Sequence, residues 1–212
     1  MTGAARDEDA ERLERLTVAA LYIDPRGPYP RMPGVDCWDA ARDARLYAGP
    51  WPVVAHPTCG PWGCLRHLYR GSEHDCAPRA IEQVRAHDGV LEHPAHSRLW
   101  AHARLPRPDE LPDEYGGWTL EVNQVDWGHV ALKPTWLYLV GVPRVRMKMP
   151  PPGRPTHWVG GSRGRGRTDR HLRGHIPEGF LACSAPKRRR TPPAFAAWLV
   201  TLARSARAAE VA

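Results

Sequence analysis

A cysteine and a glutamate lie at the ends of two apolar runs, where a sheet would present both at one edge. Cys59 follows WPVVAHP, and Glu92 lies within GVLEHP. One amphipathic segment and two loops separate the runs, so we expect neighbouring or near-neighbouring strands. A thiolate beside a carboxylate suits attack on C6 of a pyrimidine, because the carboxyl group can protonate or hydrogen-bond N3 as charge enters the ring.

The elements that must position these residues alternate along the chain. Strands are expected at 17–24, 51–57 and 89–94 and in the later runs GWTLEVNQVDWG and TWLYLVGV; helices are expected at 36–49, 76–89 and 191–209. This alternation predicts an α/β fold with a Rossmann-like, mostly parallel sheet flanked by helices. Functional residues of such sheets lie beyond the carboxyl ends of strands, where we expect Asp24, Cys59 and Glu92.

Length and composition favour one core with a small appendage. The 212 residues are 42% apolar and include 23 prolines and 19 glycines, which imply short elements and much loop. We expect an α/β core at 1–142, a basic, irregular insertion at 143–187 and a returning helical segment at 188–212. The charged start, the lack of a membrane-length apolar run and five irregularly spaced cysteines predict a cytoplasmic protein that has reduced thiols and no membrane partner.

Positive charge is concentrated late in the chain. Between Pro143 and Thr191 there are 13 Lys or Arg and two acidic residues, so this segment carries +11 while the whole chain carries +7. Only three lysines occur in the chain, and arginine suits phosphates and guanine edges. The segment predicts a polyanion partner, most simply DNA, although an arginine-rich solvated surface is the alternative. The arginines expected on DNA are Arg163, Arg165, Arg167, Arg170, Arg188, Arg189 and Arg190.

Several motifs resemble those of the DNA cytosine-5 methyltransferases, in the same order along the chain. PVVAHPTC resembles the Pro-Cys nucleophile motif, and GVLEHP, 33 residues on from Cys59 to Glu92, resembles the Glu-Asn-Val motif. VNQVDWGHVALKPTWLYLVG resembles the Gln-x-Arg-x-Arg strand, and RRRTPPAFAAWL resembles the helix after the target-recognition region. The resemblance implies a class I methyltransferase-like fold in which 143–187 replaces the target-recognition domain, as a compact, phage-like DNA-modifying enzyme would have.

The resemblance also implies roles for individual residues. Cys59 is the expected nucleophile, and Glu92 contacts the base at N3. Pro57, Trp62, Lys133 and Thr135 are expected to contact the flipped base or its surroundings. Asp24 and Asp36 are the candidates for contact with S-adenosylmethionine, the methyl donor that the resemblance implies. The chain departs from the family by having Thr58 before the nucleophile and no Phe-x-Gly-x-Gly loop.

Other interpretations of the same residues stay open. Cys59 can be a buried filler thiol, and Glu92 can be a residue that only bonds a loop. A donor-free reaction such as deamination, another one-carbon or larger donor, or a non-catalytic DNA-binding relative fits the shortened cofactor half. Cysteines and histidines between Cys59 and Cys76 also permit a zinc-stabilised interaction module, although their spacing lacks the paired knuckles of structural zinc sites. We expect no metal.

The charge pattern yields a first testable prediction. DNA affinity should fall steeply with salt, because each neutralised phosphate releases counterions. Replacing Arg163, Arg165, Arg167 and Arg170 with glutamine should weaken binding and reduce the slope of log affinity against log salt by roughly 3–4. Fluorescence anisotropy between about 50 and 200 mM salt checks both effects. Affinity that ignores salt would contradict the assignment.

Overall fold

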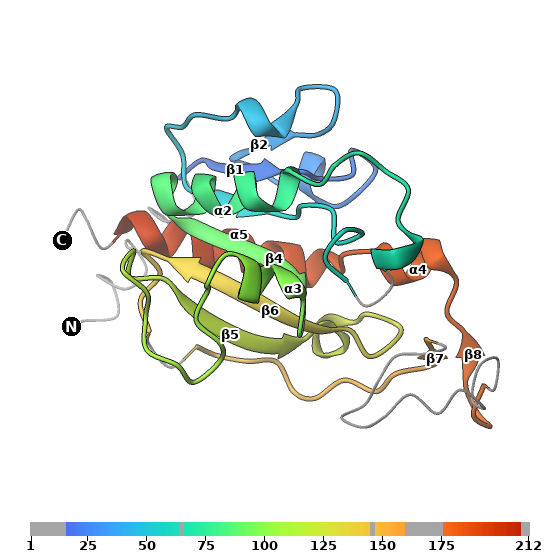
Figure 1. The fold of residues 1–212 in the computed structure, drawn as a ribbon. Helices are drawn as coiled ribbons and strands as arrows, with labels where there is room; N and C mark the ends of the chain where they lie inside the picture. Colours follow the sequence, from blue (N-terminus) through green and yellow to red (C-terminus); the bar gives the residue numbers. More distant parts are fainter. Residues whose placement is uncertain (1–15, 64–65, 145–146, 160–175, 209–212) are drawn as a thin grey trace, which may run out of the picture.

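The computed structural model describes residues 16–63, 66–144, 147–159 and 176–208. Its centre is a six-stranded sheet in the order β2-β1-β3-β4-β6-β5, and a two-stranded sheet, β7-β8, lies apart from it (Figure 1). Strands β2, β1, β3 and β4 are parallel, whereas β6 is antiparallel to both β4 and β5. The expected mixed α/β fold with a mostly parallel sheet is therefore confirmed.

The strand bounds follow the apolar runs of the sequence closely. The strands of the large sheet are β1 (Val18–Leu21), β2 (Val35–Trp38), β3 (Val53–Ala55), β4 (Gly89–Pro94), β5 (Trp118–Asn123) and β6 (Pro134–Val140). Every residue of β1 and β3 is buried. Central parallel strands are covered on both faces, so continuous apolar runs rather than alternating ones encode them.

Helices cover the two faces of the sheet and close two apolar clusters. Helix α5 (Pro193–Ala208) packs its buried residues, including Phe195 and Leu199, against Val54 and Val90 on one face. On the other face, α2 (Cys76–His87) and the short α3 (Arg98–His102) cover a cluster that includes Val53 and Leu91 (Figure 1). Successive residues of β3 and β4 thus point to opposite cores, as the pleat requires.

The helix expected at 36–49 is wrong. Residues 35–38 form β2, which pairs in parallel with β1 from Val18↔Val35 to Leu21↔Trp38. The next residues turn, because the Asp39 carboxylate accepts hydrogen bonds from the backbone of Ala41 and Arg42. Only the 3-10 turn η2 (Ala44–Leu46) follows. Pairing with an apolar neighbouring strand outweighs the local helical pattern of this segment.

The remaining elements lie where the chain leaves the sheet. Short 3-10 turns are η1 (Tyr29–Arg31), η3 (Arg66–Leu68) and η4 (Gln124–Trp127), so the strand-like run GWTLEVNQVDWG ends in a turn. The basic segment contains β7 (His157–Trp158), β8 (Leu181–Ala182) and α4 (Ala185–Arg189). No helix among the described residues is long and apolar enough to cross a membrane.

Gly89 is the tightest point of the β3–β4 pairing and gives the second prediction. Its φ is +118°, and a Cβ there would lie 2.0 Å from the Val53 carbonyl oxygen. Gly89→Ala should lower the free energy of unfolding by about 3 kcal/mol or more, because backbone cannot move aside cheaply. Denaturant titration measures the loss.

Gly116 supplies the matched control for this substitution. Its φ is +69°, yet a Cβ there would meet nothing within 4 Å. Gly116→Ala should therefore cost only the backbone strain, about 1–2 kcal/mol. Equal losses in the two variants would contradict the close approach of β3 to β4.

Candidate functional site

The strand order of the large sheet reverses direction between β1 and β3. From β1 the chain continues outward to β2 and then returns to β3 on the opposite side of β1. Ligands of open α/β sheets bind beyond the carboxyl ends of the strands at such a reversal. Three segments meet at this edge: the loop after β1, the His56–Cys59 segment after β3, and the end of β4 with Glu92.

Glu92 is the centre of a polar cluster at this edge. Glu92 is only 8% exposed. Its side chain points to the α5 side of the sheet, as that of Val90 does two residues earlier. One carboxylate oxygen accepts a hydrogen bond from Gln124 Nε2 at 2.8 Å. The other lies 3.0 Å from His56 Nδ1. Both oxygens therefore have protein partners from other strands or loops.

The first arm of the cluster runs from Glu92 through His56 to Tyr29. Tyr29 Oη lies 2.5 Å from His56 Nε2, and the two rings are 5.3 Å apart. Tyr29 lies on η1, in the β1–β2 connection, and is 2% exposed. Burial, together with the nearby Glu92 charge and Cys37, raises its pKa well above the ordinary value. Tyr29 therefore stays a protonated hydroxyl.

The second arm runs from Glu92 through Gln124 to Thr135. Gln124 Nε2 also donates to Thr135 Oγ1 at 3.0 Å, and Thr135 Oγ1 donates to the Lys133 carbonyl. Gln124 and Thr135 are both fully buried. The expected substrate contact Thr135 thus has its hydroxyl engaged within the protein, and it influences the site through Gln124.

Glu92 stays ionised despite its burial. Burial alone would raise the pKa of this carboxyl, but the Lys133 charge and the His56 hydrogen bond outweigh it and hold the pKa at about 2. A carboxylate with such a pKa accepts hydrogen bonds at neutral pH and has no proton to donate. The geometry thus favours hydrogen bonding by Glu92 over protonation of a base by it.

Cys59 lies at the exposed rim of this cluster. The preceding Pro57 is buried, and the Cys59 carbonyl accepts backbone hydrogen bonds from Trp62 and Gly63. Although the residue reaches solvent, surrounding protein desolvates the sulfur, which raises its pKa; the Glu92 charge acts in the same direction. Lys133 and Arg189 oppose this shift, so the thiol feels one anion and two cations.

The short helix α4 brings cations to the same rim. Arg189 and Arg190 are exposed, Arg188 is half-buried, and the Arg190 carbonyl accepts from Lys133 Nζ at 3.4 Å. Lys187 anchors the helix by contacting His157 at 2.9 Å. The structure thus places Arg189 near the thiol, whereas Arg163, Arg165, Arg167 and Arg170 lie outside the described residues.

Trp62 is fastened to the surface of the α2–α3 layer. Its ring lies 4.7 Å from that of His102, and its carbonyl accepts from the backbone of Arg98. Trp62 Nε1 is buried without a hydrogen-bond partner among the described residues. The loop after Cys59 is therefore tied to α3 through Trp62, while Cys59 itself faces outward.

The residues at the β1–β3 reversal do not fit the contacts expected for S-adenosylmethionine. The Tyr29 and His56 side chains already pack against each other there. Asp24 is exposed and bonded by Arg26, and Asp36 accepts from Trp38 and from Arg42 at 2.6 Å. Neither expected cofactor contact is thus a free carboxylate facing a cavity, and only the turn η1 stands between β1 and β2.

A metal site is also not assembled in the described part of the chain. Nowhere there do three His, Cys, Asp or Glu side chains gather at a spacing that would hold an ion. Cys64, one member of the zinc alternative, lies outside the described residues. Cys76, another member, begins helix α2.

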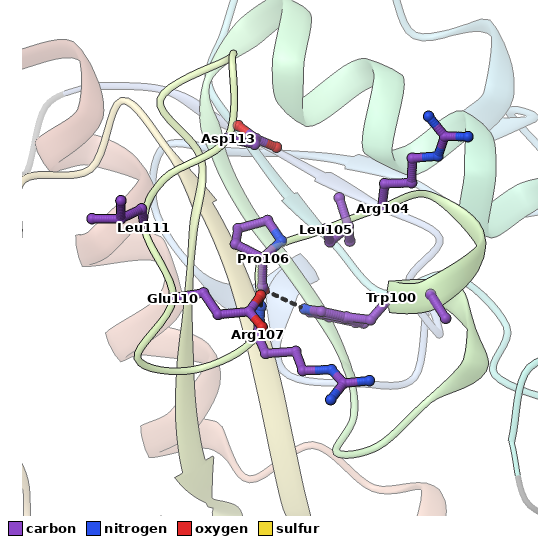
Figure 2. A pocket seen from close by; sticks show the side chains of 9 residues that line it. Trp100, Arg104, Leu105, Pro106, Arg107, Glu110, Leu111 and Asp113 are labelled. Carbon is purple, nitrogen blue, oxygen red and sulfur yellow. Dashed lines mark hydrogen bonds between the residues drawn. The ribbon is translucent and has the colours of Figure 1, made fainter.

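An open depression of about 330 Å³ lies elsewhere, against the loop after α3 (Figure 2). Trp100, Leu105 and Pro106 form part of its lining, and Trp100 Nε1 donates to the Pro106 carbonyl. It shares no residue with the Glu92 cluster. The depression and the Glu92 cluster are therefore separate features of the molecule.

Sequence reasoning left two members of the cluster unnoticed. Tyr29 lies in a proline-rich connection without periodicity, so no pattern indicates where its ring packs. Gln124 lies within the run expected to be a strand. The feature that could have identified it is its position as a polar residue directly after WTLEVN. His56, directly after β3, is the third member, and its ring lies between Tyr29 and Glu92.

The opposing charges around Cys59 generate the third prediction. Glu92→Gln should lower the thiol pKa and speed alkylation at pH 7, whereas Lys133→Met should raise the pKa and slow alkylation. A change of about one pKa unit alters the thiolate fraction about tenfold. Iodoacetamide labelling followed by peptide mass spectrometry resolves Cys59 from the other cysteines. Glu114→Gln, which removes an exposed charge outside the cluster, is the control; equal effects of both glutamate variants would contradict the arrangement.

Comparisons of the chain with protein-family models, with curated proteins and with solved structures find no match. Its function must therefore be argued from the geometry of the Cys59–Glu92 cluster.

Proposed function

We propose that the protein modifies a pyrimidine base of DNA, cytosine in the first place, by attack of the Cys59 thiolate on C6. The observation that carries the proposal is the convergence of one thiol, one buried carboxylate and two cations at a single sheet edge. Glu92 lies on β4 and Cys59 lies in the segment after the neighbouring parallel strand β3, whereas Lys133 and Arg189 come from distant parts of the sequence.

The chemistry assigns a separate task to each group. The S–C6 bond forms as the thiol proton leaves to solvent, and the C5–C6 π electrons move into the ring. Glu92 accepts a hydrogen bond from the exocyclic amine or from an N3–H, which orients the base and stabilises the adduct. Lys133 and Arg189 stabilise the thiolate before attack. The activated C5 then bonds to an electrophilic carbon from a carbon donor, whose leaving group departs with the bonding electrons. Loss of the C5 proton to solvent then breaks the S–C6 bond and regenerates the Cys59 thiolate.

The strand order supports the same proposal. An antiparallel strand, β6, lies between the last parallel strand, β4, and the edge strand β5. Class I methyltransferase sheets, which the sequence motifs resemble, have this arrangement at the corresponding edge. On the other side, β2 is the one strand beyond β1 in the described part of the chain.

DNA is the proposed partner because the rim of the site is cationic. Lys133 and the exposed Arg189 act on the Cys59 thiol, and the exposed Arg190 is joined to Lys133 through its carbonyl; these cations would contact phosphates. C6 of a stacked base is out of reach, so the base must leave the helix or be single-stranded. Cys59 is exposed at the rim and Glu92 lies deeper. This difference in depth suits a base that enters the site edge first.

A second function, DNA binding without chemistry, is favoured by one observation. The pKa of the Cys59 thiol is raised, so at neutral pH the protonated, less nucleophilic form predominates in the free protein. A bound base and its phosphates would change this balance in the enzyme but not in a pure binding protein. The two functions differ in whether a covalent adduct forms.

Covalent trapping is the fourth prediction and the test of this proposal. DNA containing 5-fluorocytosine or 5-fluorouracil should form a stable adduct with the protein, because fluorine at C5 blocks release. Cys59→Ser should abolish the adduct, and Glu92→Gln should slow its formation by roughly 10²-fold or more. Denaturing electrophoresis and intact-mass measurement detect the product.

Cys183→Ser is the matched control, since Cys183 lies on the basic segment away from Glu92 and should leave trapping unchanged. If the protein binds DNA yet neither base, in single- or double-stranded DNA, gives an adduct, the enzyme proposal fails and the binding function stands.

A further inference from the structure

We propose that Tyr29 and His56 are positioning residues of the thiol site, which pack together at the β1–β3 reversal and hold Glu92 as an oriented hydrogen-bond acceptor. This inference rests on the proposed function and deepens it. It assigns roles to two residues that neither the sequence motifs nor the chemistry of attack on C6 requires.

Two backbone segments bring the Tyr29 and His56 side chains together at the β1–β3 reversal. His56 directly follows β3, and its backbone N–H donates to the Leu21 carbonyl at the end of β1. The β1–β2 connection returns over the same edge, so that η1 buries the Tyr29 ring against the imidazole. The place where a Rossmann-like sheet binds a nucleotide thus contains two of the protein's own side chains.

The hydrogen bonds of the pair determine the direction in which His56 donates. The ionised Glu92 carboxylate can only accept, so the ring proton that faces it at 3.0 Å lies on Nδ1. In this arrangement Nε2 is the accepting nitrogen, and Tyr29, which keeps its proton, donates to it. Glu92 and Tyr29 thus favour the same tautomer of His56 from its two sides.

Glu92 retains acceptor capacity for a substrate in this arrangement. Each of its oxygens accepts one protein hydrogen bond, from His56 and from Gln124, whereas a carboxylate oxygen can accept two. The two partners bond different oxygens and so restrict the orientation of the carboxylate.

The fifth prediction separates positioning from simple packing. His56→Leu should slow adduct formation at saturating 5-fluoropyrimidine DNA about 10- to 100-fold, with the DNA dissociation constant unchanged, because only the orientation of Glu92 is lost. His56→Asn, whose side-chain N–H can replace Nδ1–H, should recover most of the rate. Tyr29→Phe, which keeps the aromatic ring against His56 and removes only the hydroxyl group, should slow adduct formation less than His56→Leu. Circular dichroism verifies folding.

Rates that fall equally in the leucine and asparagine variants, or a loss carried wholly by DNA affinity, would overturn the inference.

A second measurement needs no substrate and therefore tests the hydrogen-bonded pair separately from the proposed function. Side-chain ¹⁵N chemical shifts of His56 in the unmodified protein should show a proton on Nδ1 and none on Nε2, and Tyr29→Phe should move the Nε2 shift because it removes the hydrogen-bond donor to that nitrogen.

An Nε2–H ring in the unmodified protein, or shifts unaffected by Tyr29→Phe, would refute the pairing even if the adduct forms. Conversely, absence of any adduct together with the expected shifts refutes the proposed function and its dependent positioning role, while the hydrogen-bonded pair itself stands.

Discussion

Burial of the Glu92 charge is the constraint on which the candidate site depends. An ion removed from water costs several kcal/mol unless partners replace its hydration. Here the replacement comes from His56, Gln124 and the charge of Lys133, which belong to three different parts of the chain. A single carboxylate therefore requires β3, β4 and the β5–β6 region to be in their final places together.

The sheet meets this requirement through the two different neighbours of β4. Parallel pairing with β3 brings the residue after Ala55 to the edge where Glu92 lies. Antiparallel pairing with β6 brings Thr135 opposite Pro94 at the same edge, although β6 runs the other way. A wholly parallel sheet would present the carboxyl end of every strand here, whereas this one also presents the beginning of β6. That is how Lys133 reaches the thiol.

Sequence reasoning succeeded where one kind of interaction dominates and failed where two compete. The runs that became β1, β3 and β4 are apolar throughout because both faces are covered, and their pattern predicts strands directly. Residues 36–49 have helical spacing, but a free edge of β1 was available for Val35–Trp38. The position of the Tyr29 ring depends on how a proline-rich connection crosses the sheet edge, which no local pattern encodes. Gln124 is recognisable only once β5 is known to end at Asn123.

Helix α5 has a consequence for how the protein is made. Phe195, Leu199 and Ala203 cover the sheet face that bears Val54 and Val90, and Glu92 lies on the same side. Until α5 has left the ribosome, this face of the sheet is not covered by its helix, and the apolar side chains of the strands are exposed. The edge that bears Glu92 thus acquires this apolar cover only after α5 has been synthesised.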